Sequence, residues 1–436
     1  MRHQLAIAIG VALLGVSGMA LALTDTETNA SIPFNLATPG ARSMGMGGAF
    51  LGLADDATAA YSNPAGLTQL VSPEISVEAR HTRYSIPYVD TGSVTLNPFN
   101  ASGLKNANAD SSRNNLSFLS VVFPHDRWSF AFYRDELVNF KDELRSSDAG
   151  AVVGNLYNTF PVNARSDLKI INYGFSAAWK AGDNISLGAG LSYYDFDIDT
   201  LVRRRTFPGA ADGIPAGTPI NQQTQVGDDN DVGLNLGARI VFNEQLSAGV
   251  VYRRGPSFDY HAQSVLLPLS PGATPTVAVD LAKVRFKVPD QFGAGFSWHP
   301  SDSLVVNFDA DYIEYSQLTR GIESLFGTST ATVSRLSISN GTELHLGAEY
   351  TFAQLQHPFS LRAGVWHDPR HSIAFVGDPG SDPQGIALAT LFSAGKGSQT
   401  HASIGAGFAF KKFQIDAAAD FSDLTDVISV SAVYRF

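Results

Sequence analysis

The chain has 436 residues, a formal net charge of −11, 16% charged residues, 11% aromatic residues, 40 glycines and no cysteine. The negative charge argues against nucleic acid as a partner, and the lack of cysteine excludes disulfides, thiolate metal ligands and cysteine nucleophiles. The share of charged residues is low, and the chain has no internal apolar run of the roughly 18 residues that a transmembrane helix needs. Both features suit an outer-membrane β-barrel, although a soluble all-β protein could have the same composition.

Residues 1–22 have the three parts of a secretory signal peptide. MRHQ supplies positive charge, LAIAIGVALLGVSGMA is a short apolar stretch, and Ala20-Leu21-Ala22 forms an A-x-A cleavage site. An uncleaved N-terminal anchor is the alternative interpretation. We predict that the mature chain begins near Leu23.

Residues 23–72 carry no strand pattern and little charge. Either Asp55 or Asp56 can cap a short helix over the following ATAAY. Pro64 keeps Asn63 out of the helical region of backbone conformation and ends that helix. We therefore expect a compact, mainly helical segment here.

From Ile75 onward, apolar residues alternate with small or polar ones, which is the period of a half-buried β-strand. In ELHLGAEYTF at 343–352, for example, Leu344, Leu346 and Tyr350 share one face. This alternation predicts fourteen strands, at 74–84, 115–123, 127–137, 167–180, 184–200, 230–242, 245–258, 283–298, 303–316, 341–353, 358–367, 399–410, 413–422 and 426–436.

The connections between these strands alternate between short ones, such as 124–126 and 181–183, and long ones, such as 138–166 and 201–229. Short periplasmic turns and long outer loops are typical of transmembrane barrels, and an even strand number returns both ends to the periplasm. We predict an all-β protein of the bacterial outer membrane. Its residues 73–436 form a 14-stranded antiparallel β-barrel, and residues 23–72 form a hatch inside the lumen.

The predicted last strand ends in ISVSAVYRF, whose apolar face finishes at the carboxyl-terminal Phe436. This ending resembles the C-terminal assembly signal of outer-membrane barrels, which predicts the barrel-assembly machinery as a partner. Outer-membrane lipid and lipopolysaccharide are further expected partners, and Arg203 to Arg205 could contact lipopolysaccharide phosphates. A soluble β-sandwich or propeller is the alternative fold.

Other motifs carry weaker alternatives. Gly45 to Gly48 could cradle a phosphate, but no strand precedes it and no Lys-Ser/Thr follows. His367 and His371 could bind a metal, although Pro369 argues against a helix between them, and GDDND at 227–231 could attract Ca²⁺ but fits a solvated loop tip better. No nucleophile elbow is present. We expect no enzyme activity, no catalytic residue, no metal and no cofactor.

The stretch GARSMGMGGAFLGLADDATAAYSNPAGL, residues 40–67, resembles the hatch of the long-chain fatty-acid transport porins. This FadL family also includes aromatic-hydrocarbon transporters. The match covers the glycine run, ADDA and NPA in order and spacing. Later stretches add to it, namely VPDQFGAGFSW at 288–298, LHLGAEY at 344–350 and LRAGVWHD at 361–368. The fourteen predicted strands equal the number in that family's barrel.

The resemblance implies passive uptake of hydrophobic molecules, first of all long-chain fatty acids. Ligand would be caught at outer loops, held in a pocket above the hatch and released sideways where the third strand kinks. Arg134 to Glu136 interrupt the apolar run of that strand. Aromatic or alkane hydrocarbons are the alternative ligands, and a polar-solute porin or a surface adhesin is the alternative function. The implied gate residues are Asn63, Pro64 and Ala65, and the ligand-contact candidates are Ile32, Pro33, Phe34, Phe50, Arg203 and Arg335.

Overall fold

The computed structural model describes residues 32, 34, 36–96, 98–147, 156–157, 161–206, 214–269, 272–319, 335–380, 382–395 and 397–436. The predicted signal peptide, the first part of the predicted hatch and Pro33 lie outside the described residues. Across the described ranges, no helix is both long and apolar enough to cross a membrane.

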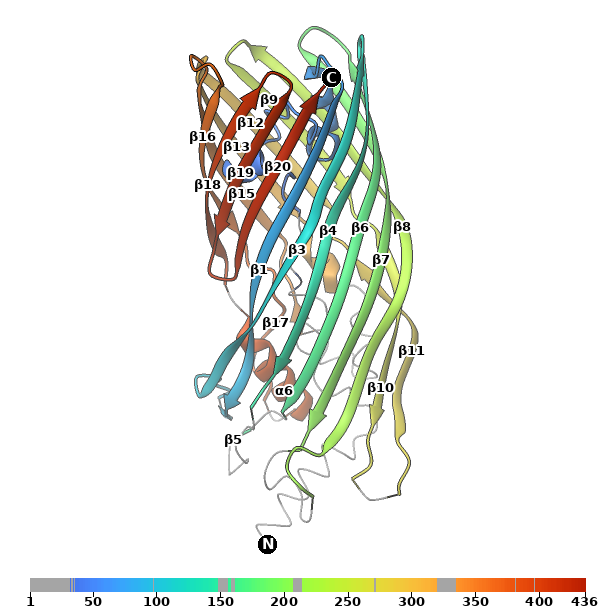
Figure 1. Ribbon diagram of the computed structural model, residues 1–436. Helices are drawn as coiled ribbons and strands as arrows, with labels where there is room; N and C mark the ends of the chain where they lie inside the picture. The colour runs from blue at the N-terminus through green and yellow to red at the C-terminus, as the bar shows by residue number, and fades with distance from the viewer. Residues whose placement is uncertain are drawn as a thin grey trace.

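Sixteen strand segments form one closed antiparallel sheet (Figure 1). The segments are β1 (Glu74–Gly92), β3 (Leu104–His125), β4 (Trp128–Arg145), β6 (Val162–Lys180), β7 (Ile185–Arg205), β8 (Pro219–Asn243), β9 (Leu246–Arg254), β10 (Ser257–Leu266), β11 (Thr276–Lys287), β12 (Gln291–Ser301), β13 (Leu304–Ile313), β15 (Gly341–Phe352), β16 (Phe359–Asp368), β18 (Gln399–Phe410), β19 (Phe413–Phe421) and β20 (Thr425–Arg435). The ring closes where β1 pairs with β20, from Glu74 opposite Arg435 to Tyr84 opposite Thr425.

Two pairs of these segments are halves of single strands. β9 and β10 both pair with β8, while β12 pairs with β9 and β11 pairs with β10. The chain passes from β9 to β10 through Gly255-Pro256 and from β11 to β12 through Val288-Pro289-Asp290. Each break contains a proline, which has no N–H to donate to a strand ladder. Counted as continuous strands, the barrel has fourteen, as predicted.

Several strands run farther than predicted, at the end away from Phe436. β8 begins at Pro219 instead of 230, so the GDDND stretch expected at a loop tip lies within a strand. For β4 the reason is a reversal of polarity along the wall, because its extension beyond residue 137 buries Phe140 and leaves Lys141 partly exposed. On β7, the outward Leu191 is 64% exposed, but beyond Tyr193 the exposed positions are charged, first the aspartates from Asp195 to Asp199, whereas the buried Phe196 and Ile198 face inward. The outer part of β7 therefore has a polar outside and a largely apolar inside, as a wall standing above the lipid requires.

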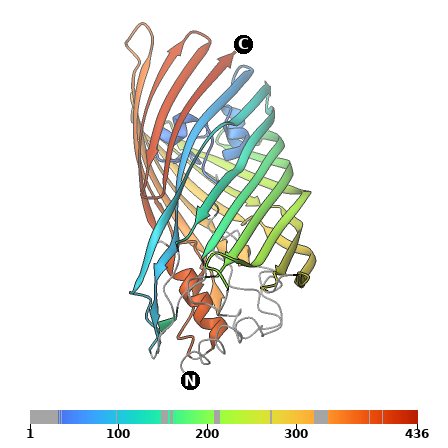
Figure 2. The ribbon, with the colours of Figure 1, turned by 60° about the horizontal axis from the view of Figure 1, so that its bottom comes forward.

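The remaining described elements are short. They comprise the helices α2 (Ala41–Gly45), α3 (Ala59–Ser62), α6 (Pro383–Leu391), η1 (Pro64–Gln69), η2 (Tyr315–Thr319) and η3 (Phe392–Ala394) and the strand pairs β2 (Val94–Thr95) with β5 (Leu156–Tyr157) and β14 (Leu336–Ser337) with β17 (Ala374–Phe375). α6 lies at the mouth away from Phe436, whereas α2, α3 and η1 lie inside the barrel near the other end (Figure 2).

Residues 36–72, called the inner segment below, fill the lumen as a packed unit. Met46, Phe50 and Leu53 are buried against Phe118 and Tyr133 of the wall. Two turns are held by side chains that sequence reasoning singled out. Asp56 accepts a bond from the Thr58 N–H at 2.9 Å before α3, and Asn63 accepts one from Ala65 where η1 begins at Pro64.

The inner segment touches the wall backbone to backbone. A Cβ on Gly347 of β15 would lie 2.0 Å from the Met46 carbonyl oxygen, and one on Gly364 of β16 would lie 2.1 Å from the Gly47 nitrogen. Only a residue without a side chain allows this approach at either wall position.

We therefore expect the double variant Gly347→Ala/Gly364→Ala to push the inner segment away from the wall. Overpacking of this kind costs about 1–3 kcal/mol of stability, and ion conductance of the barrel in planar bilayers should rise. Gly182→Ala is the control, because its Cβ would meet nothing within 4 Å. Unchanged conductance and stability in the double variant would contradict this close packing.

Candidate functional site

A buried arginine ties the inner segment to the wall. The Arg42 guanidinium on α2 lies 2.6 Å from an Asp55 oxygen and 3.6 Å from Asp56, both within the inner segment, and 2.9 Å from Glu349 on β15. The Arg42 side chain is 14% exposed, and that of Glu349 is 7% exposed. Charge-assisted bonds in such a poorly hydrated place are strong, and removing one partner leaves the others uncompensated.

The network continues around the wall. Glu349 also accepts a bond from the Arg362 Nε on β16 at 2.5 Å, and an Arg362 Nη lies 2.8 Å from Asp416 on β19. Both Arg362 and Asp416 are nearly fully buried. Together with Arg42, Asp55 and Asp56 these residues form what we call the charge clamp, which joins the inner segment to the side of the wall formed by β15, β16 and β19.

Other wall groups hold the backbone of the inner segment directly. Asp309 on β13 accepts bonds from the N–H groups of Phe50 and Leu51, at 2.5 and 2.8 Å. Glu78 on β1 accepts a bond from the Gly40 N–H at 2.9 Å. Because β1 is separated from the adjacent β13 and β15 by several strands on the ring, the segment is fixed from at least two sides.

A cavity of about 240 Å³ lies on the outer side of the inner segment. One part of its lining is apolar and comes from Phe34, from the start of the inner segment and from β1 and β4, with the residues Phe34, Leu36, Tyr84, Ile86, Leu137 and Val138. Phe34 also stacks on Phe286 of β11, with ring centres 6.1 Å apart. The cavity can therefore hold the apolar body of a ligand.

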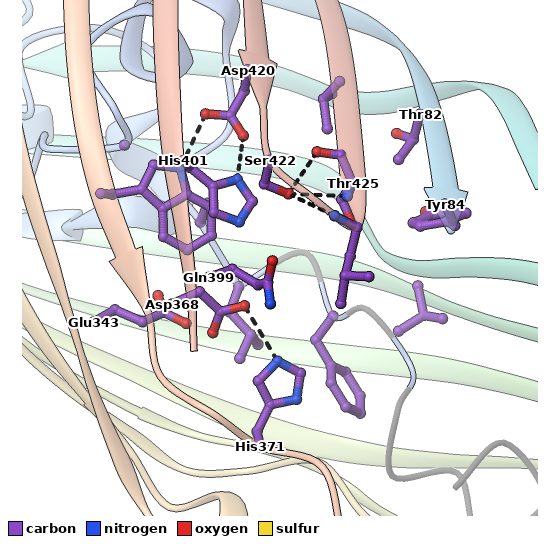
Figure 3. A pocket seen from close by; sticks show the side chains of 18 of the residues that line it. Thr82, Tyr84, Glu343, Asp368, His371, Gln399, His401, Asp420, Ser422 and Thr425 are labelled. Atoms are coloured by element: carbon purple, nitrogen blue, oxygen red, sulfur yellow. Dashed lines mark hydrogen bonds and ion pairs between the residues drawn. The ribbon is translucent and has the colours of Figure 1, made fainter. Parts of the chain in front are cut away.

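The other part of the lining, which we call the polar wall, comes largely from β16, β18 and β19 (Figure 3). Asp420 accepts a bond from His401 Nδ1 at 2.7 Å and another from Trp366 Nε1 at 3.1 Å. The Trp366 and His401 rings are stacked with centres 3.8 Å apart. Asp368, at the end of β16, lies 3.4 Å from His371 Nε2. These contacts fix the orientation of each ring.

Tyr315 on η2 completes the polar wall. Its hydroxyl donates to Glu343 at 2.8 Å, and its ring stacks on His371 with centres 4.7 Å apart. Burial, together with the nearby Glu343 and Asp368 carboxylates, raises the pKa of the Tyr315 phenol well above its usual range. The phenol therefore stays protonated and serves as a donor to Glu343.

The ladder between β3 and β4 is incomplete, and the cavity reaches this place. The pairing runs from His125 opposite Trp128 only as far as Phe118 opposite Asp135, although both strands continue outward. Beside it, the β4–β6 register shifts between Glu136 and Val138, which marks a bulge in the third strand. Bulges bend a strand and end its pairing. We call the unpaired stretch of β3 and β4 the seam.

Side chains bridge the seam where backbone bonds stop. Asn115 of β3 donates to Glu136 of β4, and Arg134 donates to the Leu116 carbonyl across the seam. Arg134 also donates to Glu136 at 2.9 Å. Both Asn115 and Glu136 line the cavity. The interruption that the sequence suggested at Arg134 to Glu136 thus lies where the β3–β4 pairing ends and the seam begins.

The predicted ligand-contact residues are dispersed. Phe34 lines the cavity, and Ile32 is buried in the apolar cluster beside it. Phe50 is fully buried between the inner segment and the wall, away from the cavity lining. Arg203 is exposed and bonds Gln222, and Arg335 stacks over Phe375 and bonds the Val376 carbonyl. Neither arginine lines the cavity, so their role as ligand contacts stays a prediction.

The Asn63-Pro64-Ala65 triplet lies against β7 and β8, whereas the seam lies between β3 and β4. Asn63 Nδ2 donates to the Leu51 carbonyl at 3.0 Å and to the Ala238 carbonyl of β8 at 3.3 Å. A Cβ on Gly188 of β7 would lie 2.3 Å from the Ala65 nitrogen. The triplet is therefore a contact between inner segment and wall, and its role in gating stays a prediction.

The alternative motifs find other roles. Within the glycine run, the Gly47 N–H donates to Ser403 at 2.9 Å and its carbonyl contacts His345 at 2.6 Å, so both groups are engaged by the wall. His371 lines the cavity, whereas His367 is exposed. In the described ranges, no group of three or more His, Cys, Asp and Glu residues is arranged to hold a metal ion.

Comparison with known proteins adds family evidence. Residues 22–424 match the family model described as outer membrane protein transport protein (OMPP1/FadL/TodX). Outer membrane protein P1 of Haemophilus influenzae is 23% identical over 360 residues, which cover 74% of each chain. A FadL homologue of Pseudomonas aeruginosa has a similar structure, with a TM-score of 0.65 and 16% identity over 93% of this chain and 99% of that one. The Ralstonia pickettii toluene transporter TbuX has a TM-score of 0.60 and 16% identity over 92% and 99% of the two chains.

The charge clamp generates a prediction for stability. Arg42→Met leaves the buried carboxylates of Asp55, Asp56 and Glu349 with less compensation, and we expect it to lower the free energy of unfolding by about 3–5 kcal/mol. Arg165→Met is the matched control, because Arg165 and Asp199 are 46% and 52% exposed in their ion pair. Exposed pairs contribute about 0–1 kcal/mol. Denaturant unfolding in detergent micelles would measure both, and equal losses would argue against the clamp.

Proposed function

Because the chain belongs to the OMPP1/FadL/TodX family of outer-membrane transport proteins, we propose that it carries hydrophobic molecules passively across the bacterial outer membrane. The observation that supports this most directly is the cavity, which is apolar along β1 and β4, lies outside the charge clamp and reaches the seam. The ligand would be captured at the outer loops and would then bind in this cavity.

The inner segment acts as the hatch in this proposal. A ligand moving straight on to the periplasm would have to break the ion pairs of Arg42 and Arg362, which cost several kcal/mol each to disrupt. It would also enter water. Each buried CH₂ group favours an apolar surrounding by ~0.8 kcal/mol, so a long chain gains far more by leaving into lipid. These energies support release through the seam.

The proposed ligands form a broad chemical class. Long-chain fatty acids are the first expectation from the sequence, and aromatic or alkane hydrocarbons are the alternative. Membership of the family supports hydrophobic molecules as a class and is compatible with either. The exposed Phe436, whose N–H donates to the Pro73 carbonyl at 3.0 Å, remains the proposed contact for the barrel-assembly machinery.

Uptake measurements test the function. Cells that lack this protein should take up radiolabelled long-chain fatty acid or toluene several-fold more slowly than cells that express it, whereas sugar uptake should not change. The reason is that the cavity offers apolar contacts to the fatty acid or toluene, whereas the charge clamp closes the water-filled path that a sugar would need. A loss of sugar uptake with hydrophobic uptake intact would contradict the proposal.

Locking the seam tests the route of release. The chain has no cysteine, so Asn115→Cys/Glu136→Cys introduces the sole thiol pair, which a short, reducible thiol cross-linker can join across the seam. We expect cross-linking to reduce hydrophobic uptake at least several-fold and reduction to restore it.

Val121→Cys/Phe132→Cys is the matched control, because these residues are direct partners in the paired part of the β3–β4 ladder. Joining them adds a link at a place where backbone hydrogen bonds already hold the two strands together. If the seam cross-link leaves uptake unchanged, or if the control cross-link reduces uptake equally, the ligand leaves by another exit.

A further inference from the structure

The cavity lining contains more carboxylates than guanidinium groups. Four carboxylates line it, those of Glu136, Glu343, Asp368 and Asp420, together with two guanidinium groups, those of Arg80 and Arg370. A carboxylate ligand would bring a further negative charge into this lining, and like charges in a poorly hydrated cavity repel each other strongly.

The two arginines are already engaged within the protein. Arg80 Nε donates to the buried Glu78 at 2.7 Å, and Arg370 Nε donates to Ser372 at 3.1 Å. The Arg80 side chain is also 6% exposed. A ligand carboxylate would therefore find both guanidinium groups partly committed to other partners.

The polar wall instead presents hydrogen-bond acceptors. Ionised Asp420 only accepts, so His401 Nδ1 must carry the proton of their 2.7 Å bond. In a neutral imidazole the other nitrogen, Nε2, is then an acceptor. The stack with Trp366 fixes the ring in this orientation, and Figure 3 shows it beside Gln399 on the cavity side.

A second acceptor lies nearby on the same wall. Asp368 Oδ2 pairs with His371, whereas Asp368 Oδ1 is buried and receives no hydrogen bond from the part of the chain that is described. A buried carboxylate oxygen without a donor is costly. It would be satisfied by a ligand group that donates, and a carboxylate ligand cannot do so.

We propose, on the basis of the function proposed above, that the cavity selects hydrophobic molecules whose polar end donates hydrogen bonds, a hydroxyl or an amine, over those that end in a carboxylate. The head group lies at His401 and Asp368, and the apolar body lies along Tyr84, Ile86 and Val138. The amine would gain in addition from the surplus of carboxylates.

Trp366 provides a reporter for this binding. It is one of four tryptophans, and the other three, Trp128, Trp179 and Trp298, are exposed on the outside of the barrel. In a variant with these three replaced by Phe, the remaining fluorescence comes from the cavity. The probes are ω-brominated dodecanol, dodecylamine and dodecanoate, which differ in their head groups and quench tryptophan on contact.

At neutral pH we expect dodecanol and dodecylamine to quench Trp366 at concentrations about tenfold lower than dodecanoate, which corresponds to about one good hydrogen bond. His401→Phe keeps an aromatic ring on Trp366 but removes the acceptor, and Asp368→Asn removes the unsatisfied oxygen. Each should reduce the preference for the donor heads. Asp368→Asn keeps the test valid if His401→Phe fails to fold, which heat-modifiable gel mobility would reveal.

His261→Phe and Asp280→Asn are the matched controls. His261 and Asp280 form a comparable pair, 2.5 Å apart, on the exposed β10–β11 hairpin away from the cavity. Both variants should keep the full preference. Dodecanoate binding as tightly as dodecanol would overturn the inference but leave the proposed function standing. Quenching by none of the probes would overturn both, because the cavity would then not be a ligand site.

Discussion

The requirement that every backbone group in lipid find a hydrogen-bond partner shapes this molecule throughout. It is met by closure, since β1 pairs with β20 along its whole membrane-facing length. Where the backbone pairing between strands is interrupted, side chains supply hydrogen bonds in its place. At the seam Asn115 and Arg134 supply donors, and at the proline breaks Lys287 donates to the Gly255 carbonyl at 2.6 Å. The wall can therefore be interrupted only where polar side chains are at hand, and this limits where a lateral opening can form.

Closure creates a second demand, because fourteen strands enclose more space than their own inward side chains fill. The inner segment fills it, and glycines at Gly347 and Gly364 let it lie against the wall. Its charges face wall charges, as in the contact of Arg42 with Glu349. The lumen thus tolerates the charges of Arg42 and Glu349 because they are paired with each other. The cavity farther out contains groups with unused hydrogen-bonding capacity, such as Asp368 Oδ1, which a ligand can meet.

Sequence patterns predicted much of this wall and little of the cavity. Period-two alternation located the fourteen strands of the barrel, although not the short pairs outside it, and Pro64 correctly marked the end of α3. The outer extension of β4 was missed because outward polar and inward apolar positions reverse the expected pattern, as at Lys141 and Phe140. Phe50 does not line the cavity, and the sequence alone does not separate an apolar residue packed in a plug from one that meets a ligand. Trp366, His401 and Asp420 come from three strands, and no local sequence pattern predicts that residues so far apart in the chain are in contact.

The arrangement of the cavity also bears on the direction of transport. Its apolar lining belongs to β1 and β4, beside the seam, whereas the groups that could hold a polar head belong to β16, β18 and β19, on the other side of β20. A ligand bound by its head at His401 would present its tail to Leu137 and Val138, where the β4 bulge lies. The tail would then reach lipid first, and each CH₂ that leaves the cavity exchanges one apolar surrounding for another. The head remains the last group to be released, so the polar contacts, more than the apolar ones, would set the barrier to exit.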